Sequence, residues 1–376
     1  MFTFIKKYLI LIVLIWSSLS VFAQVPQLTE KSKVSIITCG TSTELHSLFG
    51  HTGIRIQDTN LGLDLVYNYG AFDFGVPNFY GKFIQGDLLY FIGLDDYASF
   101  LFNYQADGRS VWEQVLNISQ SQKQNLFKEL AESFGTEKAL YTYKFIDKNC
   151  TTLAADLITK HTGVKLDPKL VESSNQSNRS FLNSYLQNTY FPAFGINLAF
   201  GAKTDKKIDH VFLPKQLLEV IDKTTIQNMP LAKPVITVYE APNSETNQLP
   251  IVLGITGFFI VLGLLTMYRN IAILFFIALG LFSLVLFGLQ FYSDHSEVQL
   301  NYNLLTVNPL YFLAAYYTIA HANKKLKRVI QIIFICTLLH IVFVITQGYL
   351  YFVFPIILGV LISLIITYKL HIKLTK

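Results

Sequence analysis

Two residues in the first half of the chain have the types that thiol catalysis requires. Cys150 stands in the run Asp147-Lys148-Asn149-Cys150-Thr151-Thr152, which opens a predicted helix to about His161 that Gly163 terminates. Free N–H groups and the helix dipole stabilise a thiolate at such a helix start. His51 begins a predicted strand, where an imidazole can be exposed at the strand end. A nucleophilic cysteine needs a base of this kind within hydrogen-bond reach, and a third group that fixes the tautomer of the base.

Other interpretations of these residues remain open from the local pattern alone. Cys39 is the only other cysteine ahead of the apolar C-terminal region, and a Cys39–Cys150 disulfide would leave a non-catalytic binding module. His46 and His51 lie five residues apart, but no third ligand at a familiar spacing accompanies them, so we expect no metal site. For the helix start, Asp147 and the two threonines are the expected capping groups.

The segments around Cys150 and His51 have the patterns of strands and short helices mixed along the chain, which predicts an α+β domain. Strands are predicted at Val34–Thr38, Thr52–Gln57, Leu63–Tyr69, Leu88–Ile92 and Val111–Ile118. Helices are predicted at Phe79–Ile84, Tyr97–Tyr104 and Gln120–Phe134, ahead of the cysteine helix.

The composition of the 376-residue chain excludes several classes of protein. With 52% hydrophobic and only 15% charged residues, it does not fit a purely cytosolic protein. The 31 Phe and 21 Tyr residues exclude a disordered chain, and three Cys are too few for a disulfide scaffold. The net charge of +5 is too small to indicate nucleic acid as a partner. A membrane protein with a sizeable exported part fits these numbers.

The apolar residues divide the chain into four segments. Residues 1–23 contain Lys6 and Lys7, an apolar run and Ala23, and so predict a signal peptide. Residues 24–230 have the composition of one globular domain, and residues 231–250, which are polar and contain three prolines, predict a linker. Residues 251–376 predict a membrane domain.

Five apolar stretches follow the linker, and most of them are long enough to cross a hydrocarbon layer of about 30 Å. The third stretch is the shortest. They are Ile251–Met267, Ile271–Tyr292, Thr306–Ala320, Val329–Thr346 and Leu350–Thr367.

The distribution of charge predicts the orientation of these spans. With five spans and an exported N-terminal domain, all basic residues after Pro250 fall on one side, while Asp294 and Glu297 fall on the other. This is the positive-inside pattern. We therefore expect a multi-pass membrane protein with an exported N-terminal domain and a cytoplasmic C-terminus.

The motif Phe49-Gly50-His51-Thr52-Gly53-Ile54-Arg55-Ile56, followed by Asn149-Cys150, resembles the permuted branch of the papain-like NlpC/P60 superfamily, which includes lecithin:retinol acyltransferase. In that branch the histidine strand precedes the cysteine helix. Further stretches resemble the Lnb-type lipoprotein N-acyltransferases over nearly the whole mature chain. These are Val66–Phe74, Phe83–Gly86, Arg109 with Glu113-Gln114, Tyr143 and Asp147, Asn178-Arg179-Ser180 and Phe212-Leu213-Pro214.

The resemblance implies a permuted papain-like α+β domain joined to an all-α bundle of about five membrane helices, and an acyl transfer reaction. It also implies the bacterial inner membrane as the location, with the α+β domain in the periplasm. The acyl donor would be a glycerophospholipid, and the acceptor would be the α-amine of the N-terminal diacylglyceryl-Cys of an apolipoprotein. His51 would deprotonate Cys150, the thiolate would form a thioester with the acyl group, and the amine would then take the acyl group. The Cys150 backbone N–H is the expected oxyanion donor, and no cofactor is expected.

The resemblance also extends to the rest of the site. In the permuted fold the orienting group comes from the strand after the histidine strand, which favours Asn68, and Glu44 is the rival. Arg109 and Glu113 are expected to form a structural ion pair. The expected substrate-binding residues are Arg179 and the polar side chains between the second and third spans, which are Asp294, His295, Asn301 and Asn303.

Two other enzyme activities would use the same cysteine and histidine. A membrane-tethered peptidoglycan endopeptidase or amidase would cleave cell-wall peptides, and a phospholipase would release free fatty acid. Five spans exceed what an anchor needs, and a bundle beside the domain offers lipids a path to the site. The sequence therefore favours a lipid-handling enzyme.

Overall fold

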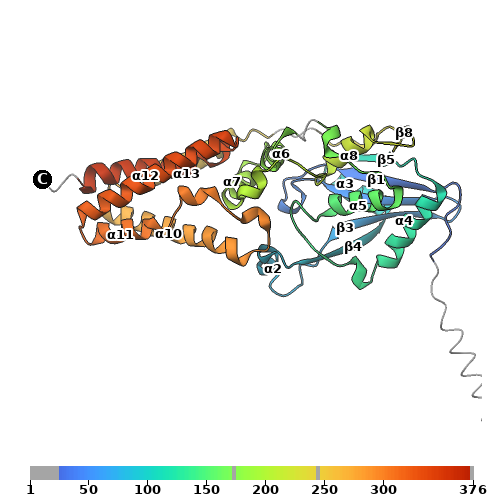
Figure 1. Ribbon diagram of the computed structural model, residues 1–376, viewed down its shortest axis with the longest axis horizontal. Helices are drawn as coiled ribbons and strands as arrows, with labels where there is room; N and C mark the ends of the chain where they lie inside the picture. The colour runs from blue at the N-terminus through green and yellow to red at the C-terminus, as the bar shows by residue number, and fades with distance from the viewer. Residues whose placement is uncertain (1–24, 172–174, 243–245, 373–376) are drawn as a thin grey trace, which may run out of the picture.

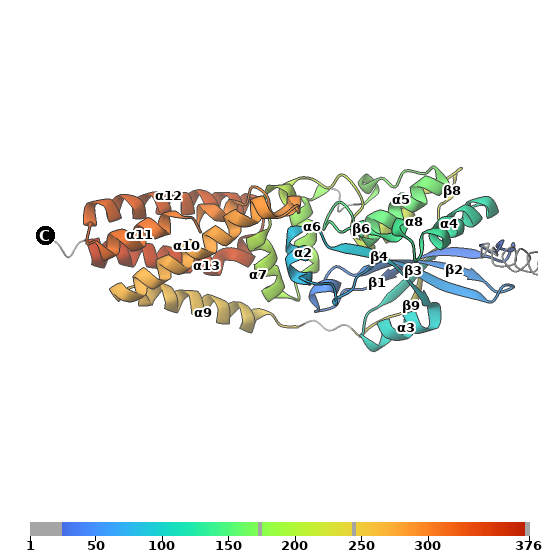
Figure 2. The same cartoon turned by 90° about the horizontal axis from the view of Figure 1, so that it is seen from below.

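The computed structural model describes residues 25–171, 175–242 and 246–372 as an α+β domain followed by a helical bundle (Figure 1). The predicted signal peptide, residues 1–23, lies outside the described residues. The two parts lie end to end along the longest axis of the molecule (Figures 1 and 2).

The domain is built on one antiparallel sheet in the order β6-β4-β3-β2-β1-β5-β9. The predicted strands are confirmed with shifts of a few residues at their ends. The strands are β1 (Lys33–Cys39), β2 (His51–Asp58), β3 (Leu63–Ala71), β4 (Leu89–Asp96), β5 (Val111–Val115), β6 (Tyr141–Thr142) and β9 (Ile236–Tyr239). A separate hairpin pairs β7 (Thr225–Ile226) with β8 (Met229–Pro230).

The last strand of the sheet corrects one expectation. Residues 231–250 were predicted to be only a linker, but Ile236–Tyr239 form β9, which pairs with the edge strand β5. The alternation of Ile236 and Val238 is the pattern of a strand, and pairing satisfies N–H and C=O groups that β5 would otherwise expose.

Helices cover both faces of the sheet, so successive residues of its central strands enter different cores. Ile36 packs in the cluster with α4, α5 and α8, whereas Ile37 packs with Phe100 of α3 on the other face. The helices are α2 (Phe79–Gln85), α3 (Tyr97–Ala106), α4 (Gln120–Ser133), α5 (Cys150–Thr162), α6 (Asn178–Tyr185), α7 (Tyr190–Ala199) and α8 (Pro214–Lys223).

The bundle contains five helices, three of which are long and apolar enough to cross a membrane. They are α9 (Leu249–Leu265), α10 (Arg269–Tyr292), α11 (Leu310–Ile319), α12 (Asn323–Thr346) and α13 (Leu350–Ile366), which a π-helical segment at Thr367–Ile372 continues. The 17 residues of α9 span roughly 26 Å at 1.5 Å per residue, which is close to the thickness of the hydrocarbon layer.

The third predicted span differs from the expectation of a helix at Thr306–Ala320. The helix α11 has only 10 residues, or about 15 Å, and a short 3₁₀ turn at Tyr302–Leu305 precedes it. Pro309 and Asn308 explain the late start, because the Asn308 side chain accepts the Leu310 N–H at 3.1 Å. The irregular backbone ahead of α11 is buried within protein, as it must be at membrane depth.

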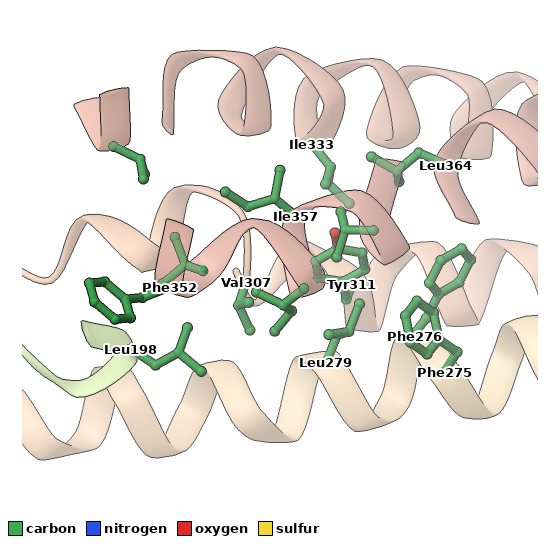
Figure 3. Packing of buried hydrophobic residues seen from close by; sticks show 14 of the residues in the cluster. Leu198, Phe275, Phe276, Leu279, Val307, Tyr311, Ile333, Phe352, Ile357 and Leu364 are labelled. Carbon is green, nitrogen blue, oxygen red and sulfur yellow. The ribbon is translucent and has the colours of Figure 1, made fainter. Parts of the chain in front are cut away.

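The domain and the bundle share one hydrophobic core. Leu48, which precedes the histidine strand, and Leu198 of α7 belong to the same cluster as Phe276 and Phe352 of the bundle. Figure 3 shows Leu198 beside Phe352, Val307 and Leu279. The loop that leads into β2 is therefore fixed against the bundle.

Residues 293–305, which we call the connecting loop, add polar contacts to this junction. The Asn301 amide donates to the carbonyls of Leu198 and Ala199 at 2.7 and 3.0 Å, and the Asn303 amide donates to that of Asn197 at 2.9 Å. A helix leaves its last four carbonyls without internal partners, so the connecting loop completes α7.

The close approach of the connecting loop requires glycine at position 201. The Gly201 N–H donates to the Glu297 carbonyl at 2.6 Å, and a Cβ atom at position 201 would overlap the carbonyl oxygen of Gln299.

We expect Gly201→Ala to destabilise the protein by about 2 kcal/mol, because the loop must move away from the domain. The matched control is Gly195→Ala within α7, where a Cβ would meet no atom within 4 Å. This change should be neutral, or stabilising by up to about 1 kcal/mol. Thermal unfolding of both variants in detergent measures the difference, and equal stability would contradict the assigned contact.

Candidate active site

His51, Asn68 and Asp95 form a hydrogen-bonded chain on adjacent strands β2, β3 and β4. Asn68 Oδ1 lies 3.1 Å from His51 Nε2, and Asn68 Nδ2 donates to Asp95 Oδ2 at 2.8 Å. Because a carboxylate only accepts, Asp95 fixes the orientation of the Asn68 amide. The amide oxygen then accepts the proton on His51 Nε2 and leaves Nδ1 free to act as a base.

Cys150 is the first residue of α5, and the side chain of Asn149 caps that helix. Asn149 Oδ1 accepts the N–H groups of Thr151 and Thr152 at 2.9 and 3.1 Å, which leaves the Cys150 N–H outside the cap. The expectation that Asp147 is a capping group is wrong, because Asp147 forms an ion pair with Lys203. Asn149 fits the position better because its own amide also donates to two backbone carbonyls.

The cysteine helix and the histidine strand meet beside Gly70. A Cβ atom built on Gly70 would lie 3.8 Å from Cys150 Cβ, 3.8 Å from His51 Cε1 and 3.9 Å from Tyr141 Oη. Gly70 has φ +110° at an irregularity between β3 and β4, a conformation that side chains disfavour. Glycine at this position lets the nucleophile and the base approach the same point.

This meeting point lies at the end of the sheet nearest the bundle. The strand β1 runs toward the bundle and β2 runs away from it, so the start of β2 at His51 is on that side (Figures 1 and 2). Leu48, three residues before His51, packs in the cluster of the bundle.

The two reactive groups change the acidity of each other. Burial alone would raise the pKa of Cys150, but the charge and hydrogen bond of His51 and the Thr52 backbone N–H lower it below the ordinary value of 9.0. Burial likewise opposes protonation of His51, yet Cys150 and Asn68 raise the pKa of the imidazole above 6.5. Both shifts favour a thiolate–imidazolium pair.

The second cysteine of the domain has the opposite character. Burial raises the pKa of Cys39 to about 12, and its thiol packs beside Phe100 and Val111. Cys39 and Cys150 are both free, so the structure contains no disulfide between them. The non-catalytic alternative, which required that disulfide, loses its basis.

Tyr141 of β6 is a member of the site that the sequence did not indicate. Its hydroxyl is buried without a hydrogen-bond partner among the described residues. The hydroxyl oxygen lies 3.9 Å from a Cβ atom built on Gly70, and Cys150 Cβ lies 3.8 Å from the same atom. Burial and the nearby Cys150 charge raise the pKa of Tyr141, so the hydroxyl stays protonated and can donate. An unpaired buried donor beside a nucleophile suits an oxyanion that arrives only with the substrate.

The other residues predicted for the site lie farther from this chemistry. Glu44 is exposed at the start of a short 3₁₀ turn, and Asn68, not Glu44, contacts His51. Arg179 is buried, forms an ion pair with Asp205 at 2.6 Å and also donates to the carbonyls of Phe200 and Gly201. Its role in substrate binding stays a prediction that these contacts weigh against.

The predicted substrate-binding residues of the connecting loop divide into two groups. Asn301 and Asn303 are buried, and their side-chain amides donate to backbone carbonyls at the end of α7. His295 Nε2 donates to the Phe83 carbonyl at 2.9 Å. Asp294 is exposed next to α2, with its carboxylate toward solvent. Of these four residues, Asp294 retains a side chain available to a ligand.

Arg109 and Glu113 do not pair with each other. Glu113 forms a buried ion pair with Arg55 at 2.9 Å, and Arg109 donates to the Gly40 carbonyl at 3.0 Å. Both residues have structural contacts, but the expected partner is wrong. No group of three or more His, Cys, Asp or Glu side chains in the described ranges could hold a metal ion.

Alkylation of Cys150 tests the ion pair. Because His51 lowers the pKa of the thiol, the rate of modification by iodoacetamide should rise with pH through a midpoint below 9.0. In His51→Gln the midpoint should move upward, because the charge and hydrogen bond of His51 no longer offset the effect of burial. Mass spectrometry locates the label, and Cys39→Ser provides the control with an unchanged profile. An identical midpoint in His51→Gln would contradict the pairing.

Tyr141→Phe tests the oxyanion donor. We expect kcat for acylation of Cys150 by an activated ester to fall about 100-fold, while KM changes little. Alkylation by iodoacetamide forms no oxyanion, so its rate should not change. Tyr67→Phe, which alters a buried tyrosine in the cluster under α5, is the matched control. Equal losses in acylation and alkylation would show a merely structural role.

Two family descriptions match the chain and together cover both of its parts. Residues 26–177 match the Lnb N-terminal periplasmic domain, and residues 248–375 match the Lnb transmembrane domain. Comparisons with curated proteins and with solved structures gave no match. The first match assigns the α+β domain to the periplasm, and the second assigns the bundle to a multi-span membrane domain. The chain therefore belongs to the Lnb family.

Proposed function

We propose that this protein is a lipoprotein N-acyltransferase. It moves an acyl chain from a glycerophospholipid, through a Cys150 thioester, to the α-amine of the diacylglyceryl-Cys of an apolipoprotein. The observation that carries the proposal is a Cys150–His51–Asn68 arrangement at the end of the sheet that faces a membrane bundle. Membership of the Lnb family supports the same activity.

The fold of the domain is a permuted papain-like fold. Three features support this assignment, which are the cysteine at the start of a helix, the histidine on an antiparallel strand, and the asparagine on the next strand. The histidine strand precedes the cysteine helix along the chain, as in the permuted branch of the NlpC/P60 superfamily.

The first half-reaction transfers the acyl group to the enzyme. The Cys150 thiolate attacks the ester carbonyl of the phospholipid, and the oxyanion receives hydrogen bonds from the Cys150 N–H and the Tyr141 hydroxyl. The carbon–oxygen bond then breaks, and the His51 imidazolium gives its proton to the departing lysophospholipid oxygen. A thioester and a neutral imidazole remain.

The second half-reaction transfers the acyl group to the lipoprotein. The neutral α-amine attacks the thioester carbonyl, the carbon–sulfur bond breaks, and His51 takes one proton from the amine. An amide forms, and the thiolate–imidazolium pair is restored. Asn68 and Asp95 hold the imidazole in one tautomer through both steps.

The membrane bundle supports a lipid donor over a cell-wall peptide. An apolar pocket of about 260 Å³ lies where the domain meets the bundle, lined by Phe194 and Leu198 of α7 together with side chains of α9, α10 and α13. The orientation that fits is five crossings with the C-terminus in the cytoplasm, because the basic residues after Pro250 then all lie inside. The third crossing then consists of the short helix α11 together with the segment ahead of it from the 3₁₀ turn onward.

The test is mass spectrometry of a diacylglyceryl-Cys lipopeptide incubated with the purified protein and phospholipid vesicles. Gain of one acyl group on the α-amine is expected with the wild type and should be lost in Cys150→Ala. The Cys39→Ser variant is the control that keeps the activity. Release of free fatty acid without transfer would indicate a phospholipase, and cleavage of cell-wall peptides alone would indicate a peptidoglycan hydrolase.

A further inference from the structure

Residues 72–86, which we call the α2 platform, expose large apolar side chains next to the bundle. Phe74 is 64% exposed, Tyr80 is 73% exposed and Ile84 is 45% exposed. The segment carries only two charged residues, Asp73 and Lys82. Contiguous exposed apolar patches are uncommon on surfaces that face only water, and they mark sites of contact with another molecule or a membrane.

The aromatic side chains of the α2 platform are held rigidly. Phe74 contacts Phe72 and Phe79 with ring centroids 4.9 and 4.8 Å apart, and Phe79 contacts Tyr80 at 5.3 Å. Because these rings already support one another, little side-chain entropy is lost when the patch enters a contact.

Three hydrogen bonds fix the platform to the end of the membrane span α10. The Ser293 hydroxyl donates to the Ile84 carbonyl at 2.6 Å, the Asp294 N–H donates to the Gln85 carbonyl at 2.7 Å, and the imidazole of His295 donates to Phe83. Lys144 Nζ joins the two segments by donating to the carbonyls of Gly86 and Asp294. The C-terminal carbonyls of α2 are therefore satisfied by residues that directly follow a membrane helix.

This attachment sets the height of the platform relative to a bilayer. The 24 residues of α10 span about 36 Å, and a hydrocarbon layer is about 30 Å thick. A helix of this length that crosses the layer would carry its last residues, the exposed Phe291 and Tyr292, to the interface between hydrocarbon and headgroups. Exposed aromatic side chains are favoured at this level, and the α2 platform begins at the same level. In Figures 1 and 2, α2 lies between the sheet and the bundle.

The platform is also connected to the active site. Phe72 contacts Tyr90 at 5.2 Å, and Tyr90 contacts Tyr141 at 6.0 Å, whose hydroxyl lies beside Cys150. Three ring contacts thus lead from the exposed Phe74 to the oxyanion donor. Tyr90 and Tyr141 are buried, so the platform and the site are joined by one packed aromatic cluster.

We propose that the α2 platform is seated in the headgroup region of the outer leaflet and is the place where the phospholipid acyl donor enters the active site. Phe74 and Tyr80 lie among the lipids, and the donor enters on the side of the site where Phe72 and Tyr90 pack against Tyr141. This entry role rests on the proposed function, whereas the contact with lipid does not.

Fluorescence quenching tests the contact. In a chain with Trp16 and Trp112 replaced by Phe, Tyr80→Trp is compared with Phe102→Trp, because Phe102 on α3 is 68% exposed but lies outside the platform. Both proteins are reconstituted into vesicles that contain phospholipids brominated on the acyl chains. The tryptophan at position 80 should be blue-shifted and quenched, and the one at position 102 should not. Equal quenching at the two positions, or none at position 80, would overturn the proposal.

Donor selectivity tests the entry role. For Tyr80→Asp, the rate of Cys150 acylation from vesicle phospholipid should fall about tenfold relative to the rate from a water-soluble short-chain ester. For Phe102→Asp this ratio should equal that of the wild type. An unchanged ratio in Tyr80→Asp would contradict the entry role. If the wild type transfers no acyl group to a lipopeptide while position 80 is quenched, the proposed function fails and the membrane contact stands.

Discussion

The connecting loop between α10 and α11 must satisfy backbone groups of the exported domain, and the arrangement of the whole molecule depends on this constraint. Its asparagine amides complete the end of α7, and its first residues complete the end of α2. An unpaired buried carbonyl costs about 1–3 kcal/mol, so the domain and the bundle are held in one relative orientation. That orientation places the start of β2, and with it His51, at the membrane side of the sheet.

The contrast between the two thiols of the domain shows how position decides reactivity. Cys39 and His51 are paired residues on adjacent strands, yet Cys39 is surrounded by apolar side chains and holds its proton. Cys150 has a helix start, an imidazole and a backbone N–H around its sulfur. The hydrogen bonds from His51 through Asn68 to Asp95 stabilise the imidazolium, and with it the buried ion pair between His51 and Cys150.

Local periodicity and helix-start chemistry were sufficient for the five main strands and the cysteine helix, whereas the pairing of Cys150 with His51 also needed the family resemblance. The same resemblance ranked Asn68 above Glu44. Asp95 and Tyr141 could not be found, because their roles arise from strand register, and the predicted strand ended before Asp95. In the sequence, Asn301 and Asn303 resemble ligand-binding residues. Their amides donate to carbonyls of α7, which lie about 100 residues earlier, and no local sequence pattern indicates such a contact.

The reliance of α7 on Asn301 has a consequence for biosynthesis. The Ala199 carbonyl finds its partner 102 residues later in the chain. At 5–20 residues per second, the ribosome needs about 5–20 s to make the intervening segment, which includes two membrane spans. During that interval the carbonyls of Leu198 and Ala199 lack the Asn301 amide that they bind in the finished protein. The junction between the domain and the bundle can therefore form only after α10 and the connecting loop have been made.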